Sequence, residues 1–163
     1  MDSAASFEAR LDLPLGYCEL SYSLDPQSVI ASVGNDGANG AIAVFIGLTR
    51  KDNLDGKIVA RLEYQAYTKL AIKTMANVIQ EVYSATFPSD SSAPIAKFAV
   101  HHRLGVVPVG EASIVIAVSA PHRKEAFAAC ESVLEEVKAK CQIWKREFYE
   151  NEADDRAEWK ANR

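Results

Sequence analysis

The strongest constraint on the fold of this chain is that helix-length and strand-length apolar patterns alternate along it. Residues 68–87 and 121–140 each place apolar side chains three or four positions apart, the spacing of one helix face. Those positions are Ile72, Met75, Ile79 and Val82 in the first segment, and Phe127, Cys130, Val133, Leu134 and Val137 in the second. Strand patterns occupy residues 17–24, 41–50, 58–67, 95–105, 111–120 and 143–150. We predict one α+β domain with a mixed or antiparallel sheet and two long helices.

Several boundaries follow from individual residues. Asp25, which a proline follows, predicts the start of a short helix, and Thr68 is a candidate N-cap of the first long helix. The continuous apolar run of residues 41–50 predicts a strand that is buried on both faces. We expect residues 1–16 to form a flexible acidic arm and residues 17–163 to form the domain.

The charge balance argues against two classes of partner. The net charge is −4, but residues 1–40 hold six acidic residues and one basic residue, so the remaining chain holds 16 acidic and 17 basic residues. Because there is no polybasic run, we predict no nucleic-acid role. No apolar stretch is long enough to cross a bilayer, and the N-terminus lacks a signal-peptide pattern. We therefore predict a cytosolic protein that does not associate with a membrane.

The cysteines and histidines do not form a metal-binding pattern. The three cysteines lack CxxC spacing, which argues against a disulfide framework and a zinc site. Cys130 falls on an apolar helix stripe, whereas Cys141 follows a lysine that could lower its pKa, so Cys141 is the candidate thiolate. His101 and His102 are neighbours in a strand and should point to opposite faces, so we expect no metal site.

Five basic residues stand where an anion site is conceivable. His122 and Arg123 fall in the first turn of a helix, where the helix dipole disfavours cations, so they form either an anion site or a surface turn. Arg50 ends an apolar strand and either enters a site or merely closes the strand. Lys138 and Lys145 are either reactive amines or the solvated end of a helix, and spacing alone favours the solvated end.

Four motifs in order resemble the large, catalytic subunit of molybdopterin synthase. They are FIGLTR (45–50), LEYQAY (62–67), HRLGVVPVGEASIVIAVSAPHR (102–123) and VKAKCQIWKREFY (137–149). The resemblance extends from about residue 40 to residue 150, and it is closer to eukaryotic than to bacterial members of the family. It implies an α/β-hammerhead-like fold.

The resemblance also implies an activity and partners. That family converts cyclic pyranopterin monophosphate to molybdopterin in molybdenum cofactor biosynthesis, with no further cofactor. The sulfur comes from a thiocarboxylate on the C-terminal Gly-Gly of a small ubiquitin-like subunit. A dimer of large subunits forms the centre of a heterotetramer.

Residue by residue, the resemblance implies catalytic roles for two lysines and substrate contacts for the other matched positions. The catalytic pair is Lys138 and Lys145, which the family also places at the substrate. The further substrate contacts are Leu48, Thr49, Arg50, His122, Arg123, Arg146 and Glu147. Lys140 has no counterpart and is expected to be solvated.

Two other functions compete with this one. The first is a module that grips a ubiquitin-like tail or a small anion without turnover. The second is a thiol enzyme that uses Cys141.

Overall fold

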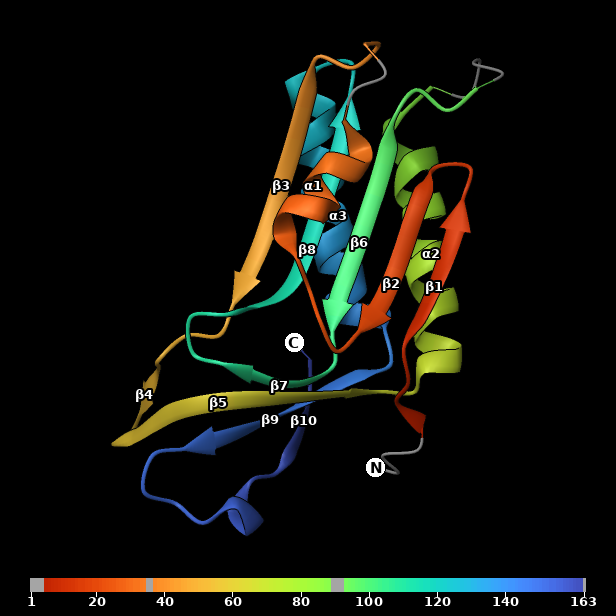
Figure 1. The fold of residues 1–163 in the computed structure, drawn as a ribbon. Helices are drawn as coiled ribbons and strands as arrows, with labels where there is room; N and C mark the ends of the chain where they lie inside the picture. The colour runs from red at the N-terminus through yellow and green to blue at the C-terminus, as the bar shows by residue number, and fades with distance from the viewer. Residues whose placement is uncertain (1–4, 35–36, 89–92, 163) are drawn as a thin grey trace.

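Two sheets and three α-helices make up the part of the chain that this computed structural model describes, residues 5–34, 37–88 and 93–162 (Figure 1). The helices are α1 (Pro26–Val33), α2 (Thr68–Thr86) and α3 (Arg123–Lys140). The strands are β1 (Ala9–Leu13), β2 (Gly16–Ser21), β3 (Ala41–Leu48), β4 (Asn53–Leu54), β5 (Lys57–Ala66), β6 (Lys97–Arg103), β7 (Gly105–Pro108), β8 (Ala112–Ala120), β9 (Ile143–Tyr149) and β10 (Trp159–Ala161). The predicted α+β domain with two long helices is confirmed.

The first sheet is mixed and carries the core. Its strand order is β1-β2-β6-β8-β3, with β2 and β6 parallel and the other pairs antiparallel. Helices α2 and α3 cover one face and α1 covers the other (Figure 1). Met75 and Ile79 of α2 pack with Phe98 and Ile116 of the sheet, and all four side chains are almost completely buried. The helical periodicity of α2 therefore buries one face, as its sequence predicts.

The second sheet is antiparallel and crosses one end of the first (Figure 1). Its order is β10-β9-β5-β4, and β7 also pairs with β5. Strands β3 and β6 of the first sheet lead directly into β4 and β7 of the second. The end of α3 turns into β9 within two residues, so this junction brings several elements together.

The N-terminal segment differs from the expected flexible arm. Residues 9–13 form the edge strand β1, paired antiparallel with β2. The residues before β1 are bonded to the start of α2. The Thr68 hydroxyl donates to the Phe7 carbonyl at 3.0 Å and accepts from the Phe7 amide at 3.1 Å. Thr68 is therefore not the N-cap of α2, a position that Tyr67 occupies. A polar sequence suits β1, because an edge strand pairs with a neighbour on one side only and its other side faces solvent.

Strand β3 is at the edge of its sheet and is not buried on both faces. Ile42, Val44, Ile46 and Leu48 alternate along one face and are each 39–57% exposed. A continuous apolar run arises equally when a strand is buried inside one chain or when one of its faces is left for a partner. Phe127, expected in the apolar stripe of α3, is likewise 67% exposed.

The helix ends resolve two boundaries. Asp25 caps α1 as predicted, since its carboxylate accepts from the Gln27 amide at 3.1 Å. Helix α3 starts at Arg123 and ends at Lys140, and the Cys141 amide donates to the Val137 carbonyl at 3.0 Å.

Candidate active site

A cavity of about 560 Å³ opens where the two sheets meet the end of α3. Lys138 reaches it from the last turn of α3, and Lys145 reaches it from β9. The other walls come from β3, β5, β8 and the segment after β3. The two lysines therefore do not share a helix face, because the chain leaves the helix between them.

The two lysine amines have different surroundings. The Lys145 side chain is 22% exposed, and its amine lies 3.5 Å from Oε1 of Glu147. Within the described residues, the Lys138 amine makes no hydrogen bond or ion pair. One amine is thus held loosely by a carboxylate, and the other is available for an anionic ligand.

Arg50 and Leu48 form part of the same cavity wall. The Arg50 guanidinium is 80% exposed and pairs with Asp52, at 2.8 Å between Nη2 and Oδ2. Since Asp52 also lines the cavity, it holds this cation at the rim. Five of the residues named from the sequence meet here: Leu48, Arg50, Lys138, Lys145 and Glu147.

Thr49 and Arg146 lie outside the cavity wall. Thr49 is 3% exposed, and its backbone pairs with Glu111 and Gly110. Arg146 is one residue away from both Lys145 and Glu147 on β9, so it points to the opposite face of the strand. There its guanidinium bonds to Glu63 at 2.9 Å. Neither side chain lines this cavity, so the substrate contacts expected of Thr49 and Arg146 stay predictions.

His122 and Arg123 are also absent from this cavity. They are exposed at the opposite end of α3, beside a separate cavity shared with Gly40. Arg123 and Lys138 are 15 residues apart (138 − 123), which corresponds to about 22 Å along a helix. One copy of the chain cannot place both at one substrate.

The cavity is also lined by a histidine, His102, that the sequence did not place in the site. His102 is fully buried, and burial lowers its pKa to about 4, with smaller contributions from His101 and Lys138 in the same direction. Its Nδ1 pairs with the Arg103 carbonyl at 2.8 Å, and its Nε2 accepts from the Asn162 amide at 3.0 Å. The sequence offered one signal for His102, which is that it begins the family motif of residues 102–123. Asn162 is 60 residues further along the chain and carried no such signal.

The thiols do not form a nucleophilic site. Burial raises the pKa of Cys141 to about 12, and the lowering expected from neighbouring cations is wrong. Lys140 does not act on this thiol, because its amine pairs with Glu136 at 2.5 Å and with Glu81 at 3.0 Å. Burial also raises the pKa of Cys130 to about 11, in agreement with its place in the core.

His101 and His102 point to opposite faces of β6, as predicted. In the segments that the structure describes, no three His, Cys, Asp or Glu side chains are grouped as metal ligands. None of the helices in these segments is both long and apolar enough to span a membrane.

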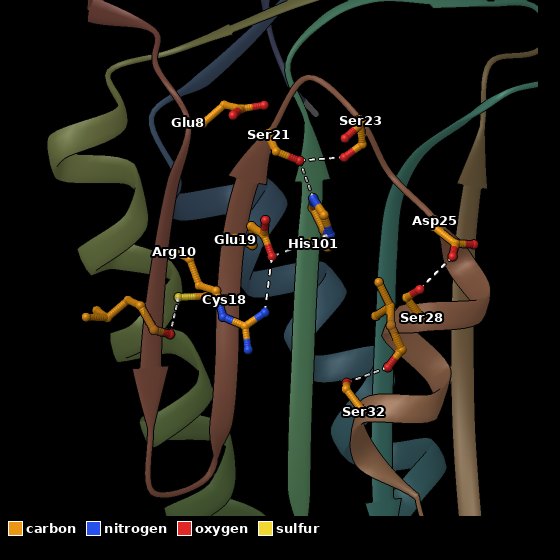
Figure 2. A network of polar contacts seen from close by, with 12 residues as sticks. Glu8, Arg10, Cys18, Glu19, Ser21, Ser23, Asp25, Ser28, Ser32 and His101 are labelled. Carbon is orange, nitrogen blue, oxygen red and sulfur yellow. Dashed lines mark hydrogen bonds and ion pairs between the residues drawn. The ribbon is translucent and has the colours of Figure 1, made fainter.

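A second polar cluster lies on the other face of the first sheet, beside α1 (Figure 2). His101 Nε2 is 2.6 Å from Ser21 Oγ, and its Nδ1 is 4.0 Å from Glu19 Oε2. The Ser21 hydroxyl donates its only proton to the Ser23 carbonyl at 2.5 Å, so His101 must donate to Ser21. This is the reverse of the proton transfer that a serine nucleophile requires, and the cluster is therefore not a hydrolytic triad.

The chain is similar to known proteins in both sequence and fold. The family model described as MoaE protein matches residues 21–140. A molybdopterin synthase catalytic subunit 2 of Aedes aegypti is 47% identical over 124 residues, which cover 76% of this chain and 75% of that protein. The structure resembles molybdopterin synthase from Staphylococcus aureus, with a TM-score of 0.74, 28% identity, and coverage of 86% of this chain and 94% of that one.

A more distant structure shares the fold. It is a protein–protein complex of subunits 1 and 2 of molybdopterin-converting factor from Helicobacter pylori, with a TM-score of 0.65 and 22% identity. The similarity covers 85% of this chain and 91% of that one.

Proposed function

Because this chain belongs to the MoaE family, the catalytic subunits of molybdopterin synthase, we propose that it converts cyclic pyranopterin monophosphate to molybdopterin with sulfur from a partner's thiocarboxylate. The observation that carries this proposal is the cavity in which Lys138, Lys145 and Arg50 meet from three separate segments. Two anions, the substrate phosphate and the thiocarboxylate, must approach each other in this reaction. Three cations around one cavity offset that repulsion.

The lysines suit the steps of sulfur transfer. In each sulfur transfer, the thiocarboxylate sulfur forms a bond to a substrate carbon while a carbon–oxygen bond at that carbon breaks, and the departing oxygen takes up a proton. Water then attacks the carbonyl carbon of the resulting thioester. The carbon–sulfur bond to the partner breaks, which leaves a carboxylate on the partner and a thiolate on the substrate. Lys138 and Lys145 stabilise the oxyanion of that attack and donate protons to the departing groups.

The partner is a small ubiquitin-like subunit whose C-terminal Gly-Gly tail carries the thiocarboxylate. The Helicobacter pylori relative of the same fold is a complex of two subunits, which supports a partner of this kind. All three cysteines of this chain are free thiols, and we place the reaction in the cytosol, where thiols stay reduced.

A second copy of the chain would complete the site. Strand β3 is an edge strand of its sheet, so another β3 can pair with it, and its exposed apolar face lies next to that edge. The start of β3 lies next to the start of α3, because the Gly40 amide donates to the Pro121 carbonyl at 3.3 Å. The other end of β3, at Leu48, lines the cavity. Antiparallel pairing of the two β3 strands therefore carries His122 and Arg123 of one copy toward the cavity of the other.

The function is tested with the purified chain, cyclic pyranopterin monophosphate and a thiocarboxylated small subunit, with molybdopterin as the measured product. Lys138→Ala and Lys145→Ala should each lower turnover by roughly two orders of magnitude or more, since each removes acid–base or oxyanion stabilisation. Lys140→Ala is the control and should behave as wild type, because this lysine pairs with surface carboxylates. Equal losses in all three variants, or tight partner binding without product, would contradict the proposal.

Mixing two inactive variants tests the shared site. In a dimer of Arg123→Ala with Lys138→Ala, one of the two cavities keeps both residues if the copies exchange them. Random mixing should therefore restore roughly a quarter of wild-type turnover. No recovery in mixtures that do form mixed dimers would show that each chain works alone.

A further inference from the structure

Glu147 separates the candidate active site from a neighbouring polar cavity. It lines both the large cavity and a second one of about 250 Å³, which also involves Lys57, Tyr149 and Lys160. Its side chain is only 12% exposed. A carboxylate in this position can transmit an effect from one cavity to the other.

The two oxygens of Glu147 have different partners. Oε2 accepts from the Lys160 amine at 2.9 Å and from the Tyr149 hydroxyl at 2.7 Å. Oε1 faces the Lys145 amine at 3.5 Å, which is longer than a normal hydrogen bond. Although burial raises the pKa of Glu147, the bonds from Tyr149 and Lys160 bring it below its ordinary value. The carboxylate therefore stays charged and is bound mainly on the side away from Lys145.

Strand pairing places the two lysines at this one anion. Lys160 of β10 is directly opposite Lys145 of β9 in the antiparallel register. Two like charges at such a pair repel each other. Glu147, two residues along β9 and on the same face, lies between them and contacts both amines.

We propose that Lys160 is a positioning residue for Lys145, acting through Glu147. Lys160 occupies Oε2, so the carboxylate holds Lys145 only by the longer contact and the amine stays free to meet substrate and tail. Without Lys160, Glu147 would draw the Lys145 amine into a full hydrogen bond and away from the reactants. This inference rests on the proposed function, in which Lys145 is a catalytic amine.

The kinetic test compares Lys160→Met with Lys57→Met. Both variants lose one cation from the second cavity, but the Lys57 amine pairs with Glu152 at 3.0 Å rather than with Glu147. Lys160→Met should lower kcat by between about tenfold and about a hundredfold with a smaller change in KM, because a displaced amine impairs the chemical step. Lys57→Met should stay near wild type, and Lys160→Arg should recover most of the loss.

A double-variant cycle tests the route through the carboxylate. In a Glu147→Gln background, the further change Lys160→Met should have little effect, because the anion that couples the lysines is gone. A full loss in that background, or wild-type kcat in Lys160→Met, would overturn the inference.

A measurement without turnover separates this inference from the proposed function. The NMR resonances of the Lys145 ε-methylene report the position and bonding of its amine. They should move in Lys160→Met and stay in place in Lys57→Met, whether or not the chain makes molybdopterin. Unchanged resonances in both variants would refute the positioning role, whereas full turnover in Lys145→Ala would refute the catalytic assignment instead.

Discussion

Acidification should destabilise this protein in part through His102. The imidazole is fully buried, and burial lowers its pKa to about 4 in the folded state, whereas an unfolded histidine has a pKa of about 6.5. Between these values the unfolded chain binds a proton that the folded chain does not. The neutral imidazole therefore costs nothing above about pH 6.5, and stability falls as the pH drops from there toward about 4.

The size of the effect follows from the difference between the two pKa values. A difference of about 2.5 pKa units corresponds to about 3.4 kcal/mol in total, of which about 2.5 kcal/mol should be lost between about pH 7.5 and about pH 4.5. Other groups also titrate in this range, so the measurement must be a comparison. His102→Gln removes the titration and keeps a side chain that can accept from Asn162.

The assay is urea unfolding of wild type and His102→Gln across this pH range. The gap in unfolding free energy between the two proteins should shift by about 2.5 kcal/mol in favour of the variant at the acidic end. His122→Gln is the control, because His122 is exposed and its variant should follow wild type. Parallel pH profiles for wild type and His102→Gln would refute the claim that burial keeps this imidazole neutral. Direct NMR titration of the His102 ring checks the same pKa when the variant is too unstable to compare.

Three further outcomes are expected. Cys141→Ser should keep wild-type turnover, because a thiol whose burial raises the pKa to about 12 is protonated at neutral pH; loss of activity in a folded variant would revive the thiol-enzyme function. Cys130→Ala should lower the free energy of urea unfolding by about 1–3 kcal/mol, since it removes a buried thiol group from the core. Val44→Lys places a charge on the exposed face of β3 and should convert the proposed dimer to a monomer in light scattering; an intact dimer would locate the interface elsewhere.

The sequence located the secondary structure better than the surroundings of each element. Residues 68–87 correspond to α2 and residues 143–150 to β9, because periodicity along the chain records which side chains of an element are buried. The same kind of pattern failed for β3, whose apolar run indicated burial on both faces. Periodicity does not say whether the covering layer belongs to the same chain, and β3 leaves one face exposed.

For the site, the sequence by itself determined which residue types were present and which family motifs carried them. Only the tertiary structure decided which of them meet. The turn after Lys140 brings Lys138 and Lys145 to one cavity from a helix and a strand. The alternation of β9 directs Glu147 into that cavity and Arg146 away from it, and the length of α3 keeps Arg123 at the far end. Proximity in space depends on how whole elements pack, which no local pattern of residues records.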